Sequence, residues 1–257
     1  DQFYPGASVC SPTRSVLMTG QHTGHTRIRG NHGKAGVTRV PLKDSDVTVA
    51  EVLKAAGYAT AVAGKWGLGE PGNEGIPNRQ GFDHWFGYLN NDLAEFYYPD
   101  KIWKNETEIT LPGNLGGKRG QYSNDLMTDE ALAFMDANRA KPFFLYLAYN
   151  APHFPMEPPA EWLARVQRRA PAMDEKRALN VALVEHFDDG VGQVLAALKT
   201  TGLEDNTLVV LTSDNGGSLP HAQNNDPWRD GKQSHYDGGL RVPFVLRWPG
   251  KVTPGAT

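Results

Sequence analysis

Apolar residues along the chain gather in short continuous runs that alternate with longer segments in which they recur every three or four positions. The short runs have the length and composition of buried strands, and they lie at residues 58–63, 143–149, 207–212 and 243–248. Helical periodicity marks the longer segments, at residues 11–19, 48–56, 123–137 and 173–199. This alternation predicts an α/β fold with a mostly parallel central sheet flanked by helices.

Capping and breaking residues set the expected helix ends. Ser11 is a candidate cap for the first helix, Pro12 suits its first turn, and Gly20 ends it. Gly57 closes the second helix and Gly202 the last one.

Polar loops follow the expected strands. They read GKWGLG at 64–69, NAPH at 150–153 and SDNGG at 213–217. Open α/β sheets bind ligands where their strands end, so these loops form the expected site. Asp214 and Asn215 offer hard oxygen ligands for Ca²⁺ or Mg²⁺. Taken alone, an Asp-Asn-Gly-Gly turn is more often structural, and its place after a strand favours a metal site.

Cys10 is the only cysteine in the chain and lies at the start of the first expected helix. A helix N-terminus favours an anion, and Arg14, one turn along, adds a forked positive charge. The combination indicates a nucleophile beside an anion site. The alternative is that Cys10 is a small buried hydrophobic residue, which is the commoner role of a lone cysteine.

Composition narrows the class of protein. The 257 residues are 39% hydrophobic and 21% charged, with a formal net charge of -3. This balance provides no basic patch for nucleic acid, and no apolar run reaches the roughly 18 residues typical of a membrane span. We therefore expect neither a nucleic-acid partner nor a membrane partner.

The motifs together resemble those of the type I sulfatases, which belong to the alkaline phosphatase superfamily. CSPTR at residues 10–14 resembles their C-x-P-x-R signature, and LMTG at 17–20 resembles its continuation. Further segments match in the same order along the chain: GKW at 64–66, PHFP at 152–155, SDNG at 213–216, GK at 231–232 and YDGGLRVP at 236–243.

The resemblance implies roles for the matched residues. Five would be catalytic: Cys10, Arg14, Lys65, His153 and Lys232. Cys10 would be converted to formylglycine (3-oxoalanine), whose hydrated aldehyde is the nucleophile. The three cationic side chains would hold the sulfate oxygens, and His153 or Lys232 would protonate the leaving group. Asp214 and Asn215 would bind Ca²⁺, with Mg²⁺ as an alternative.

The resemblance also implies a reaction and its partners. The reaction is hydrolysis of a sulfuric ester through a covalent sulfo-enzyme intermediate, with a sulfated carbohydrate as the substrate. A formylglycine-generating enzyme would be the maturation partner. Members of this family are usually exported, so the resemblance implies a location in the periplasm or outside the cell.

One departure from the family pattern concerns residue 67. Many sulfatases read G-K-W-H where this chain has Gly67, and glycine has no side chain for acid–base work. His25, His221 and Glu95 are candidates to replace that histidine or to bind substrate. The alternative for each is a plain surface residue.

A second departure concerns the ends of the pattern. The family's first strand carries an Asp-Asp metal pair that should precede Cys10, and the pair Asp188-Asp189 falls inside an expected helix instead. The family also has a smaller C-terminal subdomain after the last matched segment. The expectation is a single incomplete catalytic domain over residues 1–257, without its first strand and without that subdomain.

Two other functions fit parts of the pattern. A related hydrolase of phosphate or phosphonate esters would share the metal and the sheet. A non-catalytic glycan-binding pseudosulfatase would explain Gly67 and the missing metal pair. The matched residues of the site argue against the second alternative, because a binding protein needs no nucleophile or proton donor.

Overall fold

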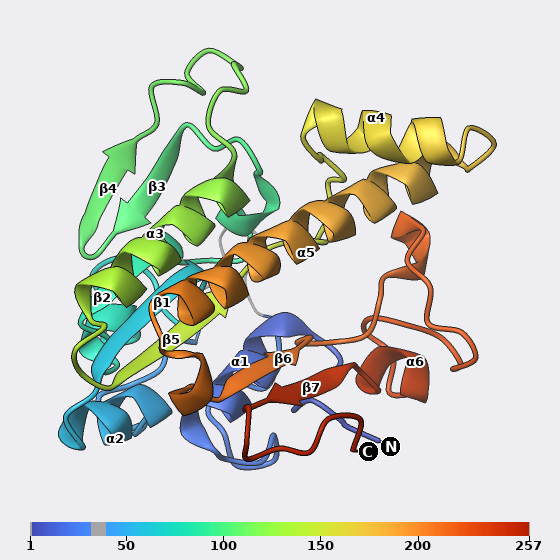
Figure 1. Ribbon diagram of the computed structural model, residues 1–257. Helices are drawn as coiled ribbons and strands as arrows, with labels where there is room; N and C mark the ends of the chain where they lie inside the picture. Colours follow the sequence, from blue (N-terminus) through green and yellow to red (C-terminus); the bar gives the residue numbers. More distant parts are fainter. Residues whose placement is uncertain (1, 32–39, 257) are drawn as a thin grey trace.

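The computed structural model describes residues 2–31 and 40–256 and centres on a five-stranded sheet (Figure 1). The strand order is β4-β3-β2-β1-β5, with β1 at Ala59–Lys65, β2 at His84–Tyr88, β3 at Lys101–Lys104, β4 at Thr107–Thr110 and β5 at Phe143–Ala148. Strand β1 runs parallel to both β2 and β5, whereas β3 and β4 pair antiparallel at one edge. The predicted α/β fold is confirmed, with a mixed sheet.

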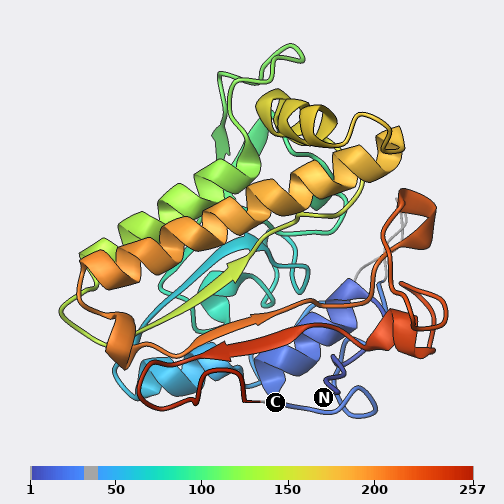
Figure 2. The same cartoon turned by 45° about the vertical axis from the view of Figure 1, so that its right-hand side comes forward.

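Helices cover both faces of this sheet. They are α1 (Cys10–Thr19), α2 (Val49–Ala55), α3 (Ser123–Ala137), α4 (Ala160–Arg169), α5 (Glu175–Thr200) and α6 (Asp237–Leu240). Figure 2 shows α3 and α5 on one side of the sheet and α1 and α2 on the other. Short 3₁₀ turns lie at Pro77–Arg79, Leu93–Glu95, Glu204–Asn206 and Leu219–His221. Within the described residues, no helix has both the length and the apolar character to cross a membrane.

The helix expected at 173–199 is α5, and it begins at Glu175. A separate amphipathic helix, α4, precedes it and packs against it, although the sequence pattern did not predict it. Asp188 and Asp189 lie within α5, as expected. The pair therefore sits on a helix and not at the end of a strand.

Helix α1 begins one residue earlier than predicted, and Ser11 is not its cap. The N-cap is Val9, which makes no side-chain bond to the helix. Instead, the Ser11 backbone N–H donates to Asn31 Oδ1 at 2.8 Å, so a neighbouring loop satisfies this first-turn donor. Gly20 ends the helix in the left-handed conformation with φ of 65°, as predicted.

The core packs around β1, which is buried along its whole length. Trp66, Phe82 and Trp85 are fully buried on one side of the sheet. The Trp66 indole Nε1 donates to the Gly75 carbonyl at 2.7 Å, so the polar end of this side chain is satisfied. This packing fixes the end of β1, where Lys65 lies buried.

The last two predicted strands form a separate sheet. Strand β6 (Val209–Thr212) pairs antiparallel with β7 (Phe244–Arg247) and does not hydrogen-bond to the five-stranded sheet. The expectation that these two strands belong to a mostly parallel central sheet is therefore wrong. The segment before α1 packs on β7, because the Phe3 ring stacks on Phe244 at 4.1 Å and the Phe3 carbonyl accepts from Val242 N–H at 3.2 Å.

Candidate active site

Three parts of the chain that are distant in sequence meet beside the N-terminus of α1. Cys10 is its first residue, Lys65 is the last residue of β1, and Asp214 follows β6 by two residues. Cys10 and Lys65 are each 2% exposed. The fold therefore gathers a thiol, a buried cation and a carboxylate in one place.

Arg14 ties these parts together. Its Nε and Nη2 both donate to Asp214 Oδ2, at 3.0 and 2.8 Å. Its Nη1 donates to the Lys65 backbone carbonyl and to the Tyr146 hydroxyl, the latter at 3.3 Å. Arg14 is 6% exposed. A planar guanidinium with five donors can make all of these bonds at once, which a lysine cannot do.

Cys10 faces the second candidate metal ligand. Its Sγ donates to Asn215 Oδ1 at 3.5 Å, and the Asn215 Nδ2 donates to the Gly216 carbonyl at 2.9 Å. The second bond fixes which end of the amide points to Cys10. Gly216 lies so close to the loop behind it that a Cβ there would be 1.8 Å from the Gly238 carbonyl oxygen, so only glycine fits this position.

The charges in the site shift each other's pKa values. Burial alone would raise the pKa of Asp214, but the positive charges of Arg14 and Lys65 outweigh burial and hold it well below its ordinary value. Burial lowers the pKa of Lys65, and the nearby Arg14 charge acts in the same direction. The site therefore contains an ionised carboxylate surrounded by cations. An incoming anion would neutralise more of this positive charge.

His153 lies on the loop after β5 and is held by its neighbours. Its Nδ1 hydrogen-bonds to the Phe154 carbonyl at 2.7 Å, and because a carbonyl only accepts, Nδ1 carries the hydrogen and Nε2 is free. Burial, together with the charges of Lys65 and Lys232, lowers the pKa of His153 to about 3. The imidazole is therefore neutral near pH 7.

Lys232 is positioned by the backbone on either side of it. Its own N–H donates to the Gly217 carbonyl at 2.9 Å, and the Gln233 N–H donates to the Ser8 carbonyl at 3.0 Å. Gln233 has a φ of 76°, a conformation that non-glycine residues seldom adopt. These bonds link the loop of Lys232 both to the loop after β6 and to the segment before Cys10.

The three residues named as replacements for the missing histidine or as substrate contacts have different surroundings. His221 stacks on Phe154 at 4.5 Å between ring centroids, and Phe154 stacks in turn on His153. Burial and the charge of Asp92 raise the pKa of Glu95, while the charges of Lys65 and Lys232 oppose this shift. His25 is exposed, and its ring contacts His22 rather than any residue of the site.

The donor set fits part of a metal site. Asp214 and Asn215 are adjacent oxygen donors beside Cys10, and the lowered pKa of Asp214 keeps its carboxylate ionised. Ca²⁺ takes six to eight oxygen ligands, more than this pair supplies. Within the described residues, no group of three or more His, Cys, Asp or Glu side chains could hold a metal ion.

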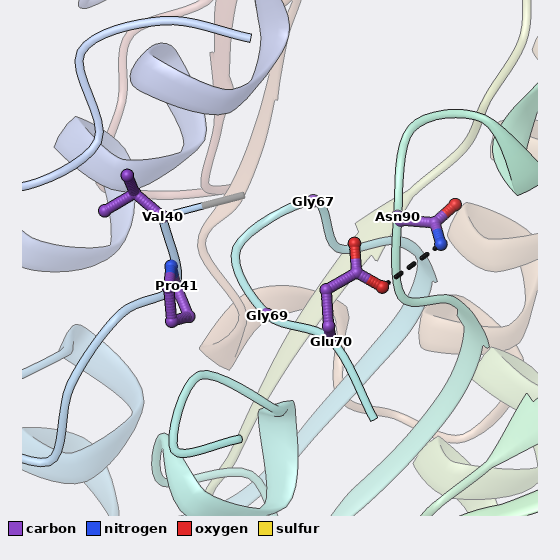
Figure 3. Close-up of a pocket in the computed structure, with 6 residues that line it drawn as sticks. All are labelled: Val40, Pro41, Gly67, Gly69, Glu70 and Asn90. Carbon is purple, nitrogen blue, oxygen red and sulfur yellow. Dashed lines mark hydrogen bonds between the residues drawn. The ribbon is translucent and has the colours of Figure 1, made fainter. Parts of the chain in front are cut away.

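Gly67 borders a small cavity of about 10 Å³, lined by Val40, Pro41, Gly67, Gly69, Glu70 and Asn90. Figure 3 shows the Glu70 carboxylate pointing into it beside Asn90, whose Nδ2 donates to Glu70 Oε2 at 3.2 Å. The volume is enough for about one water molecule. A carboxylate is thus close to Gly67, although it was not among the predicted residues.

Some residues of the site were not predicted from the sequence. Tyr146 contacts Arg14, Asn31 bonds the Ser11 backbone, and Asn91 Nδ2 donates to Ser11 Oγ at 2.9 Å. Tyr146 lies inside an apolar strand run, where alternate residues face opposite sides. That alternation was the available signal for Tyr146, whereas the two asparagines lie on loops without a recognisable motif.

The geometry gathers a thiol, cationic side chains and a carboxylate at the strand ends of an α/β protein. Comparisons with known proteins then identify the family. The sulfatase family model matches residues 1–256. The chain is 31% identical over 275 residues to N-acetylgalactosamine-6-sulfatase of Mus musculus, covering 98% of this chain and 51% of that protein. It is 30% identical over 276 residues to an arylsulfatase of Hemicentrotus pulcherrimus, covering 98% of this chain and 47% of that protein.

A solved structure is also similar. The crystal structure of Ps i-CgsB in complex with k-i-k-neocarrahexaose superposes with a TM-score of 0.83 at 31% identity, over 97% of this chain and 57% of that one. The chain belongs to the sulfatase family. It spans about half the length of the curated relatives it matches.

Proposed function

We propose that this chain carries the active site of a sulfuric ester hydrolase that releases sulfate from a sulfated carbohydrate. The observation that carries the proposal is the contact network of Arg14, which joins the turn after Cys10 to Asp214 and to the end of β1. It connects the nucleophile position to cations and to metal-type oxygen donors. Sulfate transfer needs such a set, because negative charge spreads over the sulfate oxygens.

In this proposal Cys10 is converted to formylglycine by a maturation enzyme. The formylglycine would supply a hydrated aldehyde as nucleophile, and a Ca²⁺ or Mg²⁺ ion, when bound, would supply positive charge to the sulfate oxygens. Asp214 and Asn215 would hold that ion. Arg14 keeps the Asp214 carboxylate ionised and oriented, and Lys65 and Lys232 bind the sulfate oxygens.

The leaving alcohol needs a proton, and the structure favours one of two donors. His153 is neutral near pH 7, with its only N–H at Nδ1 committed to the Phe154 carbonyl. Its free Nε2 is therefore an acceptor before substrate binds. A lysine side chain has only donors to offer, so we assign Lys232 the proton that goes to the departing oxygen, and we assign His153 to orienting the substrate.

The substrate class rests on similarity and on the surroundings of the site. One relative is named N-acetylgalactosamine-6-sulfatase, and the Ps i-CgsB structure holds a neocarrahexaose. The rings of His153, Phe154 and His221 stack on one another in that order. In this proposal the outer rings and Glu95 contact the sugar. Residues 1–257 would form a single catalytic domain of a protein exported to the periplasm or secreted.

The test has two parts, both on the full-length protein made together with a formylglycine-generating enzyme. Mass spectrometry of the peptide that contains residue 10 should show a loss of about 18 Da, because the CH₂SH side chain becomes CHO. The same protein should release sulfate from members of a sulfated-glycan panel. Faster turnover of matched phosphate esters would support a phosphohydrolase, and binding of glycans without turnover would support a pseudosulfatase.

A further inference from the structure

The space next to Gly67 is already occupied by another side chain. A Cβ on residue 67 would lie 3.0 Å from Asn91 Oδ1 and 3.4 Å from Ser11 Oγ. Gly67 also has a φ of 77°, which disfavours any other residue. The amide of Asn91 therefore fills the place where a side chain on residue 67 would begin.

Asn91 has an unused acceptor in this place. It follows β2 by three residues, and its Nδ2 donates to Ser11 Oγ at 2.9 Å. Its Oδ1 is buried and has no hydrogen-bond partner within the described residues. Leaving a buried acceptor without a donor costs about 1–3 kcal/mol. An unpaired buried acceptor in a native protein has an explanation when a bound ligand or a covalent modification supplies the missing donor.

The neighbours of this oxygen place it beside the nucleophile position. Ser11 follows Cys10 directly, and residues three or four apart on a helix share a face, so Arg14 adjoins both. The same Cβ on residue 67 would lie 3.8 Å from Arg14 Cδ. The acceptor thus borders the turn of α1 that carries Cys10 and its guanidinium.

We propose that Asn91 is a catalytic residue whose Oδ1 accepts a hydrogen bond from a hydroxyl of the hydrated aldehyde at position 10. This inference rests on the proposed function. An amide oxygen takes up no proton at ordinary pH, so Asn91 orients the hydroxyl and is not its base. The Glu70 carboxylate is a separate group, because it lies in the neighbouring cavity with Asn90 (Figure 3).

The test compares four variants of the full-length, formylglycine-bearing protein. Asn91→Leu removes the acceptor at similar volume, and Asn91→Asp keeps an acceptor. Ser11→Ala removes the hydroxyl to which Asn91 Nδ2 donates and keeps the Asn91 acceptor itself. Asn90→Leu is the matched control, because Asn90 is the adjacent asparagine and contacts Glu70 and the Leu93 backbone instead of Ser11.

Two readouts are needed, and conversion of residue 10 is checked by mass spectrometry in every variant. The first is kcat and KM for sulfate release. The second is the rate at which an aminooxy probe labels residue 10, which measures the free aldehyde and needs no turnover. A hydrogen bond to the hydrate favours the hydrate over the aldehyde, so its loss should speed labelling.

The expected result is specific to the acceptor. Asn91→Leu should lower kcat by about 10- to 100-fold, which is the effect of losing about one or two hydrogen bonds. KM should stay within about twofold of the parent value. Labelling of residue 10 by the probe should become severalfold faster. Asn91→Asp should retain most of both properties, and Ser11→Ala and Asn90→Leu should change labelling little.

Other outcomes overturn the inference. If Ser11→Ala reproduces the effects of Asn91→Leu, Asn91 acts only by holding Ser11. Unchanged labelling in Asn91→Leu would show that its Oδ1 does not contact the hydrate. Failure of the proposed function looks different, because the parent protein itself would then show no conversion, no labelling and no sulfate release.

Discussion

Arg14 and Asp214 are 200 positions apart and share two hydrogen bonds to a single carboxylate oxygen, Oδ2, at 3.0 and 2.8 Å. The arrangement leaves Oδ1 of Asp214 for another ligand. It also means that one side chain on α1 determines where the loop after β6 lies. Stability and metal binding are therefore coupled through Arg14.

Replacing Arg14 by lysine should destabilise the protein even though the charge is kept. Lysine cannot reach Asp214, the Lys65 carbonyl and Tyr146 together, so buried acceptors lose their donors. We expect a loss of about 2 kcal/mol or more in the free energy of unfolding, measured by urea denaturation.

The control for this change is Arg27→Lys. Arg27 also makes a two-point pair, with Asp46 at 2.5 and 3.2 Å, but its side chain is 35% exposed. Partly exposed pairs contribute less than about 1 kcal/mol. Equal losses for the two variants would contradict the special role assigned to Arg14.

His153 should make the protein less stable as the pH falls. Burial and the two lysines lower its pKa to about 3 in the folded state, whereas an unfolded histidine has a pKa of about 6.5. Below pH 6.5 the unfolded chain therefore takes up a proton that the folded protein refuses until about pH 3. Stability falls across this window, at most by about 1.4 kcal/mol for each pH unit.

The measurement is the urea unfolding free energy of the parent protein and of His153→Gln between pH 7.5 and 4, at steps of about 0.5 unit. The variant lacks this titration, so its stability relative to the parent should improve steadily as the pH falls. A difference that stays constant over the range would show that His153 titrates normally. Added sulfate should shrink the effect, because an anion near His153 favours its protonated form.

Several elements could be predicted because local sequence decides them. Gly20 and Gly57 end helices, and the apolar run from Phe143 forms β5. Strands β2, β3 and β4 were not predicted. β3 and β4 lack a continuous apolar run and are defined by their pairing with one another. The site motifs were found, but the asparagines around Ser11 were not, since only folding brings Asn31 and Asn91 to it.

Calcium should stabilise the full-length protein through Asp214. A ligand that binds only the folded state stabilises it by an amount that grows with the logarithm of the ligand concentration relative to Kd, which raises the melting temperature. We expect Asp214→Asn to lose most of the Ca²⁺-dependent rise in Tm measured by calorimetry, besides lowering the Tm without Ca²⁺. Asp46→Asn removes a comparable carboxylate away from the site and should keep the rise. An equal rise in both variants would place the ion elsewhere.

Alanine substitutions at two glycines of α5 should change the free energy of unfolding in opposite directions. A Cβ on Gly192 would have nothing within 4 Å, whereas one on Gly190 would lie 2.8 Å from the Tyr149 hydroxyl. Gly192→Ala should therefore raise the unfolding free energy by about 0.5–1 kcal/mol through helix propensity. Gly190→Ala should lower it, because Tyr149 and Thr128, which share a hydrogen bond of 2.6 Å, must move. Urea unfolding of both variants tests the assignment.

Alanine substitutions at Gly67 and Gly72 distinguish the effect of backbone strain from the effect of a contact with Asn91. Both have left-handed φ values, 77° and 83°, but a Cβ on Gly72 meets nothing within 4 Å. Each alanine substitution should lower the free energy of unfolding by about 1–2 kcal/mol, because alanine disfavours the left-handed backbone conformation. Only Gly67→Ala should also lower kcat, because its Cβ would displace the Asn91 amide from its position near Ser11 and Arg14. Equal turnover in the two variants would mean that the placement of the Asn91 amide does not matter for the reaction.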